Sequence, residues 1–220
     1  MNSQPVSAAL TVRLTFSKKG YAKYISHLDL QRAMMRLLRR AEIPLWMTQG
    51  FNPHPYLNFC SPLSVGIEGE NELLDIKLSD ALPDFQAMRD NIANNLPVGF
   101  QLKSISIPSR DFGDVEYACY KIVTSVSADI INDFISQPEI NVIKKTKKSE
   151  INLDLKSVAT IDSVESRAVT SDVFITLPCG RELNVNPMLW TKALEEFAGM
   201  PDSTESVIRL KFLDAAKKVF

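Results

Sequence analysis

The first half of the chain alternates apolar and polar residues in four short stretches, a pattern that predicts half-buried β-strands. These stretches cover residues 10–16, 57–67, 74–78 and 100–107. The segment EGEN, residues 68–71, lies between the second and the third stretch, so we expect it to form the turn of a β-hairpin.

Two further segments of this half carry apolar residues at helical spacing. In the first segment the apolar stripe consists of Leu30, Met34, Leu37, Leu38 and Ala41. Ser26 opens the sequence SHLD, which has the S-x-x-D spacing of a helix N-cap, and we expect Pro44 to end this helix. A second helix is predicted over DFQAMRDNIANNL, residues 84–96. The order strand, helix, strand, strand, helix, strand is the ferredoxin-like pattern.

The second half repeats this order with less regular middle strands. Strands are predicted at residues 117–126, 140–145, 151–159, 172–177 and 207–213, and a helix at 128–135. A further helix should begin with Asn186 as its cap and Pro187 at its first position, and Gly199 should end it. We therefore predict an α+β protein with two tandem ferredoxin-like (β-α-β-β-α-β) domains, residues 1–110 and 115–220.

Composition narrows the class of protein. The chain is 45% apolar, and no run approaches the roughly 20 apolar residues that a membrane span needs. The N-terminal segment lacks the basic and long apolar parts of a signal peptide. Cys60, Cys119 and Cys179 are odd in number and far apart, so they form neither a disulfide framework nor a CxxC ligand pair. We predict no metal site, no cofactor, no membrane partner and a cytoplasmic location.

Basic residues are concentrated near the start of the chain, although the net charge is −1. Between positions 13 and 40 a single acid, Asp29, stands among the arginines and lysines. Such asymmetry gives a nearly neutral protein one positive surface. A second basic segment, residues 144–148, is predicted to be a solvated hairpin turn.

The basic residues of the first segment predict an RNA-binding surface. On the exposed face of the first helix they are Arg32, Arg36 and Arg40, spaced every four residues. In the loop before that helix they are Lys18, Lys19 and Lys23. Arginine, lysine and helix N-termini supply most protein contacts to nucleic-acid phosphates. The alternative is an ordinary solvated helix face.

The loop QGFNPHP, residues 49–55, is unusually restricted. Its two prolines fix their own φ angles and push Asn52 and His54 towards extended conformations. The loop would therefore hold Gln49, Asn52 and His54 in set directions, and such rigid presentation favours recognition. The alternative is a rigid connector that serves folding alone.

His27 is the candidate for chemistry. With Tyr24 and Lys23 nearby in sequence, it could cleave RNA without a metal by moving the 2′-OH proton and stabilising the pentavalent phosphate. The alternative is a histidine at a helix start that hydrogen-bonds and packs. A site shared by His27 and His54 is open at this point.

The face of the first sheet away from the helices is predicted to lack stacking aromatic residues. It would carry Thr11, Arg13, Thr15, Asp75 and Lys77. RNA would then not stack its bases on this sheet, as it does on an RNA-recognition motif. It would use the helix, the loops or a cleft between the domains.

The segment from Lys23 to Leu78 closely resembles the radical-SAM-linked protein family, a bacterial domain of unknown function. The motifs that carry the resemblance are SHLDL (26–30), LRRA (38–41), QGFNPHP (49–55) and PLSVG (62–66). The resemblance implies a radical SAM protein as partner, because in that family the domain is often encoded beside or fused to one. This chain has no cluster-binding cysteine motif, so the radical chemistry would occur on another polypeptide.

Tyr56 differs from its counterparts in that family. It stands at a position that is often basic there, and it offers a stacking ring instead of a phosphate contact. A tandem ferredoxin-like chain with a helix-start histidine is also similar, at the level of fold, to CRISPR repeat-processing endoribonucleases.

Three functions follow as hypotheses. We favour a non-catalytic RNA-binding accessory protein that presents structured RNA to a separate radical SAM enzyme in RNA modification or processing. The first alternative is a metal-independent endoribonuclease that uses His27. The second is a protein-binding adaptor whose basic helix docks on an acidic partner without RNA.

Overall fold

The computed structural model describes residues 9–79, 84–145 and 150–220. The chain is an α+β protein that divides into two compact units, Met1–Phe112 (unit 1) and Gly113–Phe220 (unit 2). The division falls within three residues of the predicted domain limits at 110 and 115.

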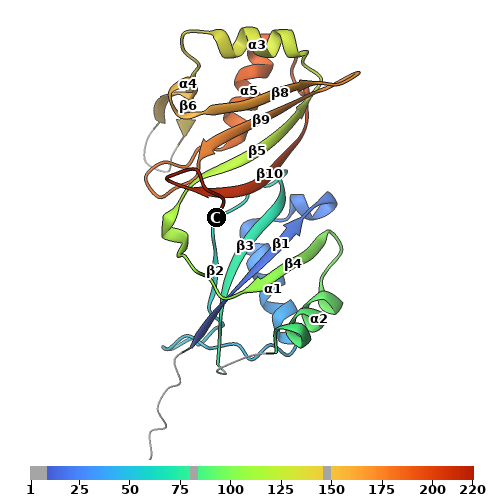
Figure 1. The fold of residues 1–220 in the computed structure, drawn as a ribbon, viewed down its shortest axis with the longest axis vertical. Coiled ribbons are helices and arrows are strands. Elements are labelled where there is room, and N and C mark those ends of the chain that lie inside the picture. The colour runs from blue at the N-terminus through green and yellow to red at the C-terminus, as the bar shows by residue number, and fades with distance from the viewer. Residues whose placement is uncertain (1–8, 80–83, 146–149) are drawn as a thin grey trace, which may run out of the picture. The chain divides into compact units, whose positions relative to one another are not determined.

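Within its described residues, unit 1 combines four strands with two α-helices and one 3₁₀ helix, followed by the short η2 (Phe112–Asp114) at its boundary (Figure 1). In chain order these are β1 (Leu10–Lys18), η1 (Gly20–Tyr24), α1 (His27–Arg40), β2 (Leu57–Phe59), β3 (Glu68–Leu78), α2 (Phe85–Asn95) and β4 (Phe100–Ser106). The strands lie in the order β4-β1-β3-β2, and each neighbouring pair is antiparallel.

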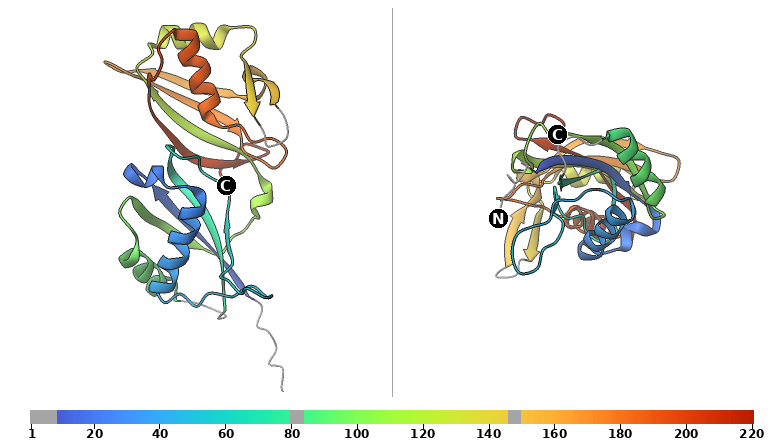
Figure 2. Two further views of the ribbon diagram at one scale, coloured as in Figure 1. Left: turned by 180° about the vertical axis from the view of Figure 1, so that it is seen from behind. Right: turned by 90° about the horizontal axis from the view of Figure 1, so that it is seen from below.

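The core of unit 1 lies between its sheet and its two helices, which cover one face of the sheet (Figure 2). Alternation in β1 sends Val12, Leu14 and Phe16 into this core. The predicted stripe of α1 is buried along its whole length, from Leu30 to Ala41. Ser26 caps the helix as expected, since its Oγ accepts a hydrogen bond from the Asp29 amide. The helix ends at Arg40, before Pro44, where Glu42 turns the chain with a φ of 54°.

The predicted hairpin turn at EGEN is wrong. Residues 68–71 open the long strand β3, whereas β2 ends at Phe59. The pairing itself is antiparallel as expected, with Leu57 opposite Ile76. The chain leaves the sheet after β2 because Pro62 donates no hydrogen bond and Gly66 adopts a φ of 89°.

Unit 2 contains the remaining elements (Figure 1). In chain order these are β5 (Val115–Thr124), α3 (Ala128–Ser136), β6 (Asn141–Lys145), β7 (Glu150–Asp154), α4 (Leu155–Val158), β8 (Thr160–Ser166), β9 (Ser171–Pro178), α5 (Pro187–Ala198) and β10 (Thr204–Asp214). A short 3₁₀ helix, η2 (Phe112–Asp114), precedes them. The main strands lie in the antiparallel order β10-β5-β9-β8, and β6 pairs with β7 separately.

The sequence predictions for unit 2 are confirmed at its last helix and are wrong for part of its middle strands. Asn186 caps α5 through the Met188 amide, and Gly199 ends it with a φ of 63°. The strand predicted over 151–159 is wrong beyond Asp154, whose side chain caps the short helix α4 instead. β8 was not predicted. The turn predicted at 144–148 lies largely outside the described residues, while its flanking strands β6 and β7 pair antiparallel.

The last strand does not alternate strictly between buried and exposed residues. Its buried side chains are Val207, Arg209, Phe212 and Leu213. A register shift between Arg209 and Lys211 explains this pattern, because an irregularity reverses which side chains face inward.

Candidate nucleic-acid interface

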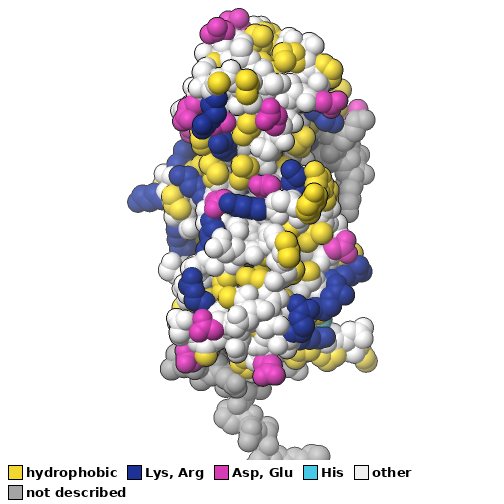
Figure 3. Space-filling view, turned by 90° about the vertical axis from the view of Figure 1, so that its right-hand side faces the viewer, with side chains coloured by type: hydrophobic (Ala, Val, Ile, Leu, Met, Phe, Trp, Pro, Cys, Tyr) yellow, Lys and Arg dark blue, Asp and Glu magenta, His cyan; other side chains and the backbone are white. Residues whose placement is uncertain are grey.

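The outer face of α1 carries four exposed arginines. They are Arg32, Arg36, Arg39 and Arg40. Arg32 forms an exposed ion pair with Asp29 at 3.3 Å, and Arg40 donates to the Asn95 carbonyl oxygen at 3.1 Å. Arg40 therefore satisfies a carbonyl at the end of α2, and Arg32 pairs with Asp29, whereas Arg36 and Arg39 are exposed to solvent. Figure 3 shows Lys and Arg side chains gathered at one edge of this unit.

The three lysines predicted beside this helix have different surroundings. Lys18 is the last residue of β1 and is fully buried, with its Nζ donating to the Ile25 carbonyl oxygen at 3.2 Å. Its predicted place in an exposed basic loop is wrong, because β1 extends to this residue. Lys23 lies with its Nζ 5.3 Å from the centre of the exposed Tyr24 ring.

Lys19 is half-exposed and pairs with a carboxylate. Its Nζ lies 2.5 Å from Glu70, which Lys103 also contacts from β4. Hydrogen bonds from Lys103 and Lys19 hold the pKa of Glu70 below its usual value. Since the single carboxylate of Glu70 pairs with two ammonium groups, the cluster of Lys19, Glu70 and Lys103 keeps a net positive charge.

The loop between α1 and β2 is closed by its own hydrogen bonds. Met47 and Pro55 form an isolated antiparallel bridge, and the Thr48 amide donates to the His54 carbonyl oxygen at 2.8 Å. The Thr48 hydroxyl accepts from the His54 amide at 3.1 Å. His54 Nδ1 donates to the Asn52 carbonyl oxygen at 3.0 Å, because a carbonyl can only accept.

This closure presents the tip of the loop to solvent. Gln49, Asn52 and His54, the candidate recognition residues of this loop, are all exposed. The prediction missed Phe51, whose side chain is as exposed as in an extended chain, at 106%. A fully exposed aromatic ring on a restrained loop is a feature of interaction surfaces.

Two aromatic residues stand beside Lys77 at the root of this loop. The Nζ of Lys77 lies 5.3 Å from the Trp46 ring centre and 4.6 Å from the Tyr56 ring centre. Lys77 sits on the face of β3 away from the core, so these rings border that face. The prediction that this face lacks stacking rings is therefore wrong. Backbone pairing brings Trp46 to Lys77, since the Trp46 amide donates to the Lys77 carbonyl oxygen at 2.8 Å. The spacing of residues along the sequence does not predict this pairing.

The middle of the same face is closed to ligands. Arg13 and Asp75 form a buried bidentate ion pair, and the Arg13 guanidinium also donates to the Arg110 carbonyl oxygen at 2.9 Å. The Phe112 ring lies 4.2 Å from the same guanidinium. Arg13 lies on the predicted face away from the core, but the end of unit 1 covers it, so it is buried.

His27 packs at the start of α1. Its ring meets the Phe59 ring edge-on, with 5.2 Å between centres. Its Nε2 accepts a hydrogen bond from the Gln31 side-chain amide at 3.0 Å. The 14-residue helix is about 21 Å long, and the loop with His54 follows its other end. The two histidines therefore lie at opposite ends of α1 and do not share a site.

No cluster of metal-ligating side chains is found in the part of the chain that the structure describes. Within residues 9–79, 84–145 and 150–220, no three His, Cys, Asp or Glu side chains gather in a way that could hold a metal ion. Among the described helices, none is long and apolar enough to cross a membrane.

Comparison with known proteins identifies the family. Residues 11–187 match the family described as "Uncharacterized protein conserved in bacteria (DUF2344)". Since this match covers most of the chain, the protein belongs to that family. No curated protein matches the chain.

Among the solved structures that match the chain is the "X-ray crystal structure of a heavy metal efflux pump, crystal form I". The sequences are 10% identical, the TM-score is 0.27, and the match covers 95% of this chain and 27% of the pump chain. The chain thus spans about a quarter of the pump's length, and a likeness of this size supports no statement about fold or function.

Proposed function

We propose that this protein binds structured RNA as a non-catalytic accessory protein through unit 1. The observation that carries the proposal is the arginine face of α1, on which Arg36 and Arg39 are exposed and Asp29 is the single acid of the helix. Guanidinium groups at this spacing suit phosphate oxygens of an RNA backbone.

The loop 47–55 supplies the second half of the proposed surface. It follows the C-terminal end of α1, so an RNA backbone along the arginines leads towards it. Phe51 offers a ring on which an unpaired base can stack, and Gln49 and Asn52 offer hydrogen bonds. Structured RNA presents such bases in loops and bulges, next to duplex phosphates.

We infer further that each unit is a ferredoxin-like domain, so that the chain is a tandem of two. The strand orders β4-β1-β3-β2 and β10-β5-β9-β8, with two helices between corresponding strands, support this inference. In unit 2 the segment β6-β7-α4 would then be an insertion.

The partner in this proposal is a separate radical SAM enzyme in the cytoplasm, to which the protein would present its RNA. This part depends on the resemblance between residues 23–78 and the radical-SAM-linked family. The three cysteines of the chain are far apart in sequence, so an iron–sulfur cluster would belong to the partner.

Crosslinking and sequencing of RNA from cells tests the proposal. The wild type is compared with Arg36→Glu/Arg39→Glu, which changes two exposed side chains of α1, and with Lys192→Glu on α5 of unit 2 as the control. A discrete RNA species that disappears in the arginine variant and persists in the control supports the proposal. A retained protein partner with no enriched RNA sinks it and favours the adaptor.

Measurement of affinity against salt concentration gives a second, quantitative test. Removal of two phosphate contacts should lower the slope of log K against log salt by about 1.5. An unchanged slope means that these arginines do not face phosphates.

The endoribonuclease alternative depends on His27. The hydrogen bond from Gln31 and the packing on Phe59 favour a structural role for this ring. Cleavage of the bound RNA in the presence of a chelator, lost in His27→Ala and kept in His54→Ala, would establish the enzyme instead.

A further inference from the structure

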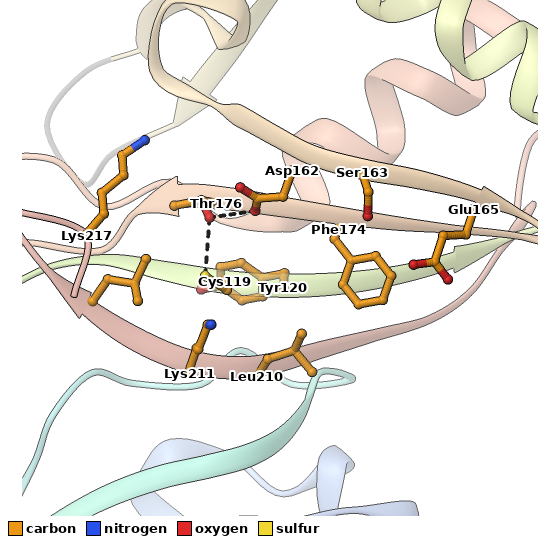
Figure 4. A pocket seen from close by; sticks show the side chains of 11 residues that line it. Cys119, Tyr120, Asp162, Ser163, Glu165, Phe174, Thr176, Leu210, Lys211 and Lys217 are labelled. Carbon is orange, nitrogen blue, oxygen red and sulfur yellow. Dashed lines mark hydrogen bonds between the residues drawn. The ribbon is translucent and has the colours of Figure 1, made fainter. Parts of the chain in front are cut away.

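Unit 2 has a pocket of about 430 Å³ on one face of its sheet (Figure 4). Alternation places the fully buried Ile122 and Ile175 on the core side of β5 and β9. Cys119, Phe174 and Thr176 occupy the opposite side and line the pocket. All residues that line it belong to unit 2, so the pocket is a property of this unit.

The floor of the pocket is a chain of hydrogen bonds. The Thr176 hydroxyl donates to Asp162 Oδ2 at 2.8 Å, since a carboxylate can only accept. Its single proton is then used, so the Cys119 thiol is the donor in the 3.2 Å contact with Thr176 Oγ1. Thr176 is 2% exposed, and these contacts fix a polar, well-ordered floor.

One rim of the pocket is formed by Lys217, which has an unusual backbone conformation. Its φ of 58° lies in the left-handed region, where a side chain with a Cβ is strained. Hydrogen bonds around Asp214 hold the turn, including one from the Lys217 amide to the Asp214 carbonyl oxygen at 2.9 Å. The exposed Nζ of Lys217 donates to Thr160 Oγ1 at 3.0 Å and lies 5.5 Å from the Tyr117 ring centre.

The register of the strands arranges the lining residues in three rows. Lys211 of β10 is opposite Cys119, which is opposite Thr176. Phe174 is the next outward residue of β9, and Glu165 of β8 pairs with the one after that, Asp172. Two residues of a strand span about 6.7 Å, so the amine row and the Glu165 row are about 13 Å apart with the Phe174 ring between them. Figure 4 shows this order, with Lys211 directed towards Cys119.

The charges differ at the two ends of the pocket. Lys211 and Lys217 bring two ammonium groups to one end, where Asp162 is already bonded to Thr176. Glu165 brings a carboxylate to the other end. It lies 4.0 Å from Arg167, too far for a hydrogen bond, and can still accept one from a ligand, whereas Asp172 is used by Lys121 at 2.9 Å and by Arg167 at 2.5 Å. A ligand that fits must therefore be anionic at one end, flat in the middle, and a hydrogen-bond donor at the other end.

We propose that this pocket binds a nucleotide whose base carries an exocyclic amino group. The phosphate contacts Lys211 and Lys217, the base stacks on Phe174, and the amino group donates to Glu165. Aromatic rings on a sheet face stack bases with little regard to sequence, and a carboxylate selects amino groups. The proposal depends on contacts within unit 2 alone, so it stands or fails separately from RNA binding by unit 1.

Calorimetry on the full chain tests it with CMP and UMP. Their bases differ at C4, which carries an amino group in cytosine and a carbonyl in uracil, and at N3, which carries a hydrogen only in uracil. We expect CMP to bind about tenfold more tightly than UMP or than cytidine, which lacks the phosphate. Phe174→Leu should weaken CMP binding about tenfold, and Glu165→Gln should narrow the difference between CMP and UMP. Lys192→Gln, an exposed lysine on α5, is the control and should change nothing.

Lys217→Gly separates a role in binding from a role in folding. Glycine tolerates the left-handed conformation, so this variant should keep or raise the unfolding temperature while CMP binding falls about tenfold. No CMP binding by the wild type, equal binding of CMP and UMP, or binding that survives both Phe174→Leu and Lys217→Gly would overturn the proposal.

A 5′-phosphorylated oligocytidine distinguishes the two sources of such a nucleotide. Tighter binding of the oligomer than of CMP, with the same dependence on Lys217, assigns the pocket to a nucleotide within RNA. Equal affinity assigns it to the free nucleotide. If the affinity for the oligomer is the same in the wild type and in the pocket variants, the result counts against the proposal.

Discussion

Arg13 and Asp75 face each other across β1 and β3 and form a bidentate ion pair, with Nε–Oδ1 and Nη2–Oδ2 distances of 2.7 and 2.8 Å. Both side chains are less than a tenth exposed. The two charges are therefore removed from water and depend on each other, and removal of one leaves the other buried without its partner.

Asp75→Asn should destabilise unit 1 by about 3–5 kcal/mol, because it leaves the Arg13 charge uncompensated. Arg13→Met/Asp75→Leu should recover most of this loss, since it removes both charges. Hydrogen exchange of the β1 and β3 amides measures the effect within this unit. If the double variant is as unstable as the single one, the pair contributes through more than its charges.

Asp172 should make unit 2 sensitive to acid. Burial alone would raise the pKa of this carboxyl, but hydrogen bonds from Lys121 and Arg167 outweigh it and hold the pKa below its usual value. A depressed pKa adds stability that is present above the unfolded-state value of about 3.9 and is lost as the pH falls below it. The stability difference between wild type and Asp172→Asn should therefore shrink from pH 7 to pH 3 in urea unfolding.

Phe51→Ser should leave stability within about 0.5 kcal/mol of wild type, because the ring is fully exposed. If the loop binds RNA as proposed, RNA affinity should fall about tenfold through the loss of one stacked base. Val98, an equally exposed apolar residue of unit 1, supplies the control as Val98→Ser. Equal losses of affinity in both variants would point to a nonspecific effect of exposed apolar area.

Thr48→Val should weaken RNA binding without removal of any residue at the loop tip. The hydroxyl of Thr48 accepts the His54 amide and thereby restrains the loop, so its loss raises the entropy cost of binding. Thr48→Ser keeps the hydroxyl and should bind as wild type does. Filter-binding assays compare the two, and hydrogen exchange at residues 48–55 reports the loss of restraint.

The parts of the fold that sequence spacing predicted are those held by local contacts. Ser26 caps α1 and Asn186 caps α5 because each side chain reaches an amide two or three residues away. The long stripe of α1 is likewise set by i, i+3 and i+4 spacing. Such patterns need no knowledge of distant strands.

The predictions are wrong where contacts between segments far apart in the sequence determine the structure. Alternation continues through residues 57–67, but the chain leaves the sheet at Pro62, so the long pairing strand begins at Glu68. Lys18 was predicted to lie in an exposed loop. It is buried instead, and its amine donates a hydrogen bond to the Ile25 carbonyl oxygen. The position of Trp46 beside Lys77 depends on strand pairing, which a single sequence does not encode in its spacing.

The bridge between Met47 and Pro55 means that the loop carries its own scaffold. Gln49, Phe51 and Asn52 can change without effect on the sheet, because the bonds that shape the loop are made by its base and its backbone. Gly50 cannot change as freely, since its φ of 131° favours glycine. If the loop binds RNA as proposed, the preference for one RNA over another can therefore change at the tip while the fold stays constant. The same segment could be transplanted between antiparallel strands of an unrelated protein with its conformation intact.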